Sequence, residues 1–339
     1  MSVSIDHYGL ALIDNLETDI QELRFTPNLR LVRLDLILDP RGTLMLGKDA
    51  IDLAKKVVSE GRLPEGRFRT IPYQQGPMAT IVQRTPEFSN HALEWHFVGE
   101  IEDPFNEHYD RYRPNKLFSD VITSLRLLKP GLVGRFGAVH AIRGDPSGIE
   151  GAWSLGETLN YQPSPMNLFE RYQLQEEGLS HLRKIFDALS VCTNQQIRIA
   201  LNRFDLQYAR GSEVDRLIDL IVAFEALYLK GISDAELRFR LAARVARHLG
   251  EDQNERSALF RRMSAAYEMR SRIVHGSIDS LRGNKLLSRM GWNSPFAMLN
   301  EMEDMLRRAI RLILVELGTE AFASIFHAAL DRAIISGER

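Results

Sequence analysis

The stretch that decides the fold of the second half of the chain reads Asp215-Arg216-Leu217-Ile218-Asp219-Leu220-Ile221-Val222-Ala223-Phe224-Glu225-Ala226-Leu227-Tyr228-Leu229. Its large apolar residues recur three and four positions apart, which is the period of one face of an α-helix. Ser212 stands just before this stretch, and a serine there is a common helix N-cap. We therefore expect a helix whose wide apolar stripe is buried among other helices. The stripe consists of Leu217, Leu220, Ile221, Phe224, Leu227 and Tyr228.

Helical patterns continue through the rest of the second half, where Pro295 is the one proline after Pro165. Ser233, followed three residues later by Glu236, is typical of a capping box at the start of a helix. The second half is predicted to be an all-α helical bundle. We expect its helices at about 166–189, 194–209, 212–230, 234–249, 253–275, 295–317 and 319–335.

The first half mixes strand and helix patterns, so the fold class is an α+β N-terminal domain followed by the helical bundle. Leu93, Trp95 and Phe97 alternate with more polar residues, which is typical of a half-buried strand. The punctuation Gln162-Pro163-Ser164-Pro165 places the boundary between domains at 1–162 and 163–339. We expect strands at 31–38, 67–73, 78–84, 93–98 and 131–142, and helices at 49–59 and 115–128, the last ended by Lys129-Pro130-Gly131.

Composition describes an ordinary globular protein, with 44% hydrophobic and 26% charged residues in 339. Cys192 is the single cysteine, which excludes an intrachain disulfide and a cysteine-cluster metal site. The segment His91–His96 misses both zinc-protease spacings and is assigned to a strand. The first residues lack the basic and apolar regions of a secretory signal, and no apolar run is long enough to span a bilayer. We expect a cytoplasmic protein with no membrane partner.

The net charge of −2 argues against a general nucleic-acid binder, but the charge is unevenly distributed. Residues 1–160 contain 18 Lys and Arg against 22 Asp and Glu, a net of −4. Residues 230–289 contain 13 Lys and Arg against 7 Asp and Glu, a net of +6. A positive surface of this kind suits a polyanion. The alternative is a solvated basic helix face.

The centre of this basic region reads Tyr267-Glu268-Met269-Arg270-Ser271-Arg272-Ile273-Val274-His275-Gly276. Arginine is permanently charged and suits a phosphate, and histidine exchanges protons most readily near neutral pH. Five residues of helix rotate by roughly 140°, so Arg270 and His275 converge only if the helix ends here, with Gly276 as its C′ residue. A second arginine-x4-histidine match, from Arg135 to His140, lies in a predicted strand or turn.

The segments 215–229, Leu237–Arg244 and 267–276 together resemble a HEPN domain (higher eukaryotes and prokaryotes nucleotide-binding), most closely the Apea-like group. The preceding segment 125–131 resembles the region before the helical domain of that group. The resemblance covers about 165–320. The family pattern is an arginine, four to six residues and a histidine, which Arg270 and His275 match. Ser271 fits the polar position after the arginine.

The resemblance implies an α-helical, often dimeric, metal-independent endoribonuclease, and many such proteins are toxins or abortive-infection effectors against phage. Arg270 and His275 would be catalytic, with His275 as general base or acid and Arg270 stabilising the phosphorane. Arg272 would bind a flanking phosphate. The expected partners are RNA and a second copy of the chain, with a regulatory ligand or phage-derived trigger at the N-terminal domain. No cofactor and no metal are implied.

Two further residues are candidates for a supporting role. Glu225 interrupts the apolar stripe with a carboxylate, which is unfavourable unless it is paired. It would orient Arg270 or His275, or it forms a structural ion pair with another helix arginine. Tyr267 lies about one turn before Arg270 and would contact RNA or belong to the core.

Two other functions stay open: a non-catalytic HEPN module that binds nucleotide or RNA, and a dimerisation scaffold. In these, Arg270 and His275 are a helix-end ion pair and a capping histidine. An open basic cleft that contains both residues would favour the enzyme. If Arg270 instead lies buried in an ion pair with Glu225 and no cleft exists, the enzyme interpretation fails.

Overall fold

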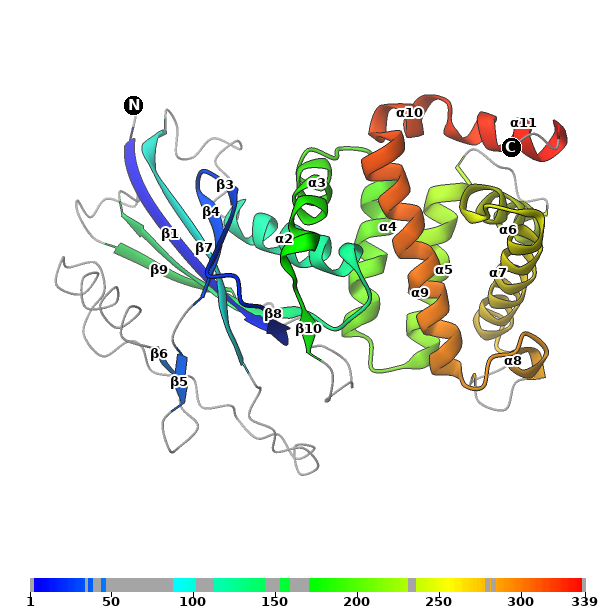
Figure 1. Cartoon of the computed structure of the whole chain (residues 1–339), viewed down its shortest axis with the longest axis horizontal. Coiled ribbons are helices and arrows are strands. Elements are labelled where there is room, and N and C mark those ends of the chain that lie inside the picture. The colour runs from blue at the N-terminus through cyan, green and yellow to red at the C-terminus, as the bar shows by residue number, and fades with distance from the viewer. Residues whose placement is uncertain are drawn as a thin grey trace. The chain divides into compact units, whose positions relative to one another are not determined.

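The computed structural model of the chain describes residues 3–33, 36–38, 44–46, 88–101, 113–143, 153–158, 171–230, 236–277, 281 and 285–336 (Figure 1). The chain forms two compact units. The first consists of Met1–Ile122 and Gly131–Leu179, and the second of Thr123–Pro130 and Ser180–Arg339. The boundary that the sequence predicts between 162 and 163 lies in 159–170, outside the described residues.

The first unit is built around an antiparallel sheet with the strand order β3-β4-β7-β1-β8-β9. Two smaller pairings accompany it: β2 (Leu16–Glu17) runs parallel to β10 (Tyr172–Gln173), and β5 (Leu36–Leu38) runs antiparallel to β6 (Leu44–Leu46). The strands of the main sheet are β1 (Val3–Asp14), β3 (Glu22–Thr26), β4 (Leu29–Arg33), β7 (Phe88–Ile101), β8 (Gly134–Arg143) and β9 (Trp153–Thr158).

The core of the first unit combines buried strand residues with the start of the helix α2 (Arg113–Leu128), on which Phe118 and Val121 are fully buried. Arg135 of β8 donates to the Ser119 hydroxyl of α2 at 3.1 Å. The predicted strands at 93–98 and 131–142 and the helix at 115–128 are confirmed within the described residues. The single strand expected at 31–38 is wrong, because β4 and β5 are separate strands that belong to different sheets. The predicted elements at 49–59, 67–73 and 78–84 lie outside them.

The second unit is helical, so the α+β part and the helical part follow one another as expected. The helix α5 is its centre and packs against α4, α6, α7 and α9; Figure 1 shows α4, α5 and α9 alongside one another. All six residues of the predicted apolar stripe are buried on α5. The helices are α3 (Leu179–Ser190), α4 (Gln195–Leu206), α5 (Glu213–Tyr228), α6 (Leu237–Leu249), α7 (Gln253–Val274), α8 (Lys285–Arg289), α9 (Pro295–Arg311), α10 (Thr319–Ser324) and α11 (Phe326–Ser336).

The described part of the chain also contains three short helical segments. The 3-10 helix η2 (Glu176–Gly178) precedes α3, the 3-10 helix η3 (Gln207–Ala209) follows α4, and the π-helical segment η4 (Leu312–Leu317) follows α9. Within the part of the chain that the structure describes, no helix has the length and apolar character needed to cross a membrane.

Three predicted helix boundaries are wrong. The helix expected from 166 begins at Leu179, because Tyr172 instead pairs with β2 and its N–H donates to the carbonyl of Asn15 at 2.8 Å. The expected capping box fails because Glu236 is itself the N-cap of α6, with a left-handed φ of 60° and no side-chain cap bond. The helix expected at 319–335 is interrupted at Ile325, which separates α10 from α11.

A buried polar network ties α9 to η3 and α5. The carboxylate of Glu303 accepts from the Tyr208 hydroxyl at 2.6 Å and from the Gln207 amide at 3.1 Å. It also pairs with Arg307, which is 2% exposed, and with Arg216 at 3.3 Å. Buried charges require partners of this kind, so the network fixes how these segments pack.

Candidate active site

The helix α7 ends as the sequence predicts, and its end determines where His275 lies. The N–H of Gly276 donates to the carbonyl of Ile273 at 2.9 Å, and that of Ser277 to the carbonyl of Arg272 at 2.8 Å. These two bonds form a Schellman motif, whose C′ residue must adopt a left-handed backbone. Gly276 does so with φ 68°, which confirms its predicted place. His275 is therefore fixed as the C-cap residue, and it is exposed.

Arg270 lies one turn inside this helix end and faces α5. Its Nη2 atom is 3.4 Å from Oε2 of Glu225, and the two side chains are 23% and 22% exposed. Its Nε–H is buried and has no hydrogen-bond partner among the described residues. A guanidinium has five donors, so the contact with Glu225 leaves Arg270 able to bind a further acceptor.

Tyr267 completes this cluster. Its hydroxyl lies near enough to the Glu225 carboxylate for each group to shift the pKa of the other. Burial raises the pKa of Glu225, although the charge of Arg270 and the nearby Tyr267 hydroxyl both act to lower that pKa. Burial and the neighbouring carboxylate also raise the pKa of Tyr267. Glu225 therefore joins α5 to two residues one turn apart on α7.

A second ionic cluster lies on the same helix, around Glu268, which no sequence motif singled out as a functional residue. Glu268 pairs with Arg272, four residues further along α7, and with Arg238 of α6 at 3.4 Å. The spacing of Glu268 and Arg272 is the favourable order for a helical ion pair, and this signal was present in the sequence. Arg272 is exposed and keeps donors for a phosphate, as its predicted role requires.

The structure does not bring His275 into the cluster of Glu225, Tyr267 and Arg270. Among the described residues its side chain has no hydrogen bond or ion pair, and its main-chain N–H donates to the carbonyl of Ser271 at 3.0 Å. Ser271 is half-buried. The candidate site is thus an anchored arginine beside a separate, solvent-facing histidine at one helix end.

The other histidine patterns have structural explanations. Arg135 and His140 lie on the strand β8, as predicted. His91 is buried on β7, where its Nε2 lies 3.1 Å from the carbonyl oxygen of Ile20 and burial lowers its pKa. No group of three or more His, Cys, Asp or Glu side chains suited to a metal ion occurs within the described ranges.

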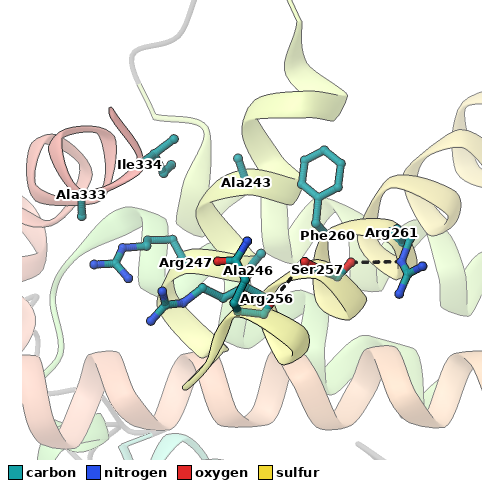
Figure 2. A pocket seen from close by; sticks show the side chains of 10 residues that line it. Ala243, Ala246, Arg247, Arg256, Ser257, Phe260, Arg261, Ala333 and Ile334 are labelled. Carbon is teal, nitrogen blue, oxygen red and sulfur yellow. Dashed lines mark hydrogen bonds between the residues drawn. The ribbon is translucent and has the colours of Figure 1, made fainter. Parts of the chain in front are cut away.

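A pocket of about 540 Å³ lies on the helical unit, and Arg270 and His275 are not among the residues that line it. Figure 2 shows the lining side chains, which come from α6, α7 and α11 and include three arginines. The positive charge of residues 230–289 was its only signal in the sequence. The lining residues are Ala243, Ala246, Arg247, Gln253, Arg256, Ser257, Phe260, Arg261, Ala333 and Ile334.

Comparisons with known proteins add no relative. The chain matches no protein-family model, and neither the curated proteins nor the solved structures contain a significant match to it.

Proposed function

We propose that this protein is a metal-independent endoribonuclease with a HEPN-like helical domain, and that Arg270 and His275 are its catalytic residues. The observation that carries the proposal is the position of Arg270. It is half-buried, is held by Glu225, and has an unpartnered Nε–H among the described residues. A fixed cation with unused donors, one turn from an exposed histidine, suits a reaction that adds negative charge to a phosphate.

The reaction is an internal transesterification of RNA. The 2′-OH attacks the adjacent phosphorus while a base removes its proton, and the P–O5′ bond breaks while an acid protonates the leaving oxygen. The products are a 2′,3′-cyclic phosphate and a 5′-OH. His275 acts as base or acid, Arg270 stabilises the charge of the phosphorane, and Arg272 binds a neighbouring phosphate. DNA lacks the 2′-OH and is not cut by this route.

The reaction needs both a base and an acid, and one histidine cannot be in both protonation states at once. A second copy of the chain, related by a two-fold axis, would supply a second His275. The proposed enzyme is therefore a homodimer. Its specific rate should fall on dilution below the dissociation constant of the dimer.

A non-catalytic RNA-binding module is the second candidate, and one observation favours it. Arg270 pairs with Glu225, although its side chain is 23% exposed, and neither Arg270 nor His275 lines the described pocket. Among the described residues no hydrogen bond or ion pair joins Arg270 to His275. Arg270, Arg272 and Ser271 would then bind phosphates without cleavage.

The test is cleavage of a structured RNA in EDTA by wild type, His275→Ala and Arg270→Lys. The lysine keeps a charge opposite Glu225 but removes the planar fork of donors. His181→Ala, on an exposed histidine of α3, is the matched control. We expect cyclic-phosphate ends from wild type and from the control, and at least about a hundredfold loss in the other two variants. Cleavage that survives His275→Ala would exclude the assigned site, and RNA binding without cleavage would select the second candidate.

A further inference from the structure

We propose that the pocket on α6, α7 and α11 binds single-stranded RNA that flanks the cleavage site. This inference rests on the proposed ribonuclease function, because it places substrate at a distance from Arg270 and His275. It assigns a role to residues that the catalytic site does not use, chiefly Arg247, Arg256 and Arg261.

The charge of the pocket favours a polyanion. Three arginines line it, and no carboxylate is among its lining residues. Backbone carbonyls hold two of these arginines in place: Arg256 donates to Gly250 at 3.0 Å and to Glu251 at 3.2 Å, and Arg261 donates to Ser257 at 3.2 Å. Figure 2 shows the last of these bonds at the edge of the pocket. Preorganised guanidinium groups bind phosphates with little loss of side-chain entropy.

The apolar part of the pocket favours bases in addition to phosphates. Phe260 lines the pocket, and its ring meets that of Phe239 edge to face, with 5.5 Å between centroids. Phe239 is 55% exposed, so its ring is accessible to a base. Aromatic rings beside a basic groove are the usual platforms on which single-stranded bases stack. Because Phe239 extends this surface beyond the lining residues, a strand fits it better than a small ligand does.

The surface of α7 connects the pocket to the proposed catalytic residues. Arg261, Glu268 and Arg272 are seven and four residues apart, so they share one helix face, and His275 follows at its end. The carboxylate of Glu268 is paired with Arg238 and Arg272, which offsets its repulsion of a phosphate chain. From Arg261 to His275 the helix rises roughly 21 Å, the length of about six stacked nucleotides.

The first test measures RNA binding by the full chain in EDTA, in a His275→Ala background that prevents cleavage. A labelled 14-nucleotide single-stranded RNA is the probe. Arg261→Glu and Phe239→Ala alter exposed side chains, and Arg183→Glu on α3 makes the same charge change outside the pocket. We expect Arg261→Glu at the pocket and Phe239→Ala beside it each to weaken RNA binding roughly tenfold. For Arg261→Glu, the slope of log affinity against log salt concentration should also be about 0.7 shallower. The Arg183→Glu protein should bind as its parent does.

The inference is overturned if both pocket variants bind RNA like their parent, or if no RNA binds at all. It is also overturned if ATP binds in an Arg261-dependent way more tightly than RNA, because the pocket would then belong to a small phosphate ligand.

A cleavage assay separates this inference from the proposed function. With His275 intact, wild type should cut a 14-nucleotide RNA faster than a 4-nucleotide RNA. Arg261→Glu should reduce the ratio of these two cleavage rates about tenfold. If cleavage depends on His275 but the two RNA lengths are cut at equal rates, the protein is a nuclease and the pocket does not bind the flanking RNA. RNA binding that depends on the pocket, without any cleavage, would support the pocket as an RNA-binding site and contradict the proposed nuclease.

Discussion

Arg270 and Glu225 form an ion pair with 3.4 Å between Nη2 and Oε2, yet burial keeps the pKa of Glu225 above its ordinary value of 4.5. A carboxyl with a raised pKa in the folded state is ionised less favourably there than in the unfolded chain. The attraction of Arg270 therefore does not offset the desolvation of Glu225. The ion pair is therefore better explained as a contact that positions Arg270 than as one that stabilises the fold.

The first prediction is that Glu225→Gln lowers cleavage but not stability. In wild type, the folded state holds the Glu225 proton to higher pH than the unfolded state does. The stability that this proton contributes is present below the unfolded pKa and is lost as pH rises through the raised folded pKa. Glutamine stays neutral, so at pH 7 the variant should unfold at the same urea concentration as wild type or a higher one. A clear loss of stability would make the ion pair structural.

The second prediction concerns His248, which is largely buried and lies 2.6 Å from the Tyr228 hydroxyl through Nδ1. Burial lowers the pKa of His248 from 6.5 to about 4. Its contribution to stability is therefore present above pH 6.5 and is lost as pH falls towards 4, by at most about 1.4 kcal/mol per pH unit.

The His248→Asn variant keeps an acceptor for Tyr228 but cannot take up the proton. Urea unfolding between pH 6.5 and 4 should show a smaller loss of stability in this variant than in wild type. Some loss remains because burial also lowers the pKa values of His91 and His327. Equal losses in the two proteins would show that His248 does not titrate in this range.

The third prediction compares two carboxylates that both pair with Arg307. Glu303 is buried, so Glu303→Ala removes the buried carboxylate that neutralises Arg307 and accepts from the Tyr208 hydroxyl, and should destabilise by about 3–5 kcal/mol. Asp304 lies 2.9 Å from Arg307 but is 48% exposed, so Asp304→Asn should change stability by less than about 1 kcal/mol. Chemical denaturation of both variants checks the difference, and similar effects would contradict it.

The fourth prediction is that Gly276→Ala destabilises α7 by about 1 kcal/mol through backbone strain alone. Nothing lies within 4 Å of an added Cβ, so no clash contributes. Gly276→Asn should be milder, because asparagine tolerates the left-handed region better than alanine does. The melting temperatures of the two variants give the order of their stabilities. Equal stabilities of the alanine and asparagine variants would show that left-handed strain at position 276 does not limit the stability of α7.

The parts of the fold that depend on local chemistry were predictable. The stripe on α5 follows from apolar residues at helical spacing, and α2 ends at Leu128 before Lys129-Pro130-Gly131 as expected. Gly276 takes the C′ position because a left-handed residue is needed there. The helical spacing of apolar residues, the proline and glycine that stop a helix, and the residue that caps it each depend on residues within a few positions of one another.

Long-range pairing was not predictable. Tyr172 has a sequence compatible with a helix, but it pairs with β2 and packs on Gly131. Glu236 has the spacing of a capping-box residue, but it adopts a left-handed backbone at the N-cap of α6. In both places the local preference was weaker than the constraint set by the tertiary structure.

The sequence by itself determined the helical character of the second unit, the end of α7 and the identity of the candidate residues, because these follow from spacing and residue chemistry. Only the tertiary structure decided that Glu225 contacts Arg270 and Tyr267, that His275 stands apart from them, and that arginines of α6 and α7 share a pocket with α11. Glu225 and Arg270 are 45 positions apart. Helical periodicity specifies which face of each helix is buried, but the packing of the helices against one another selects which side chains meet.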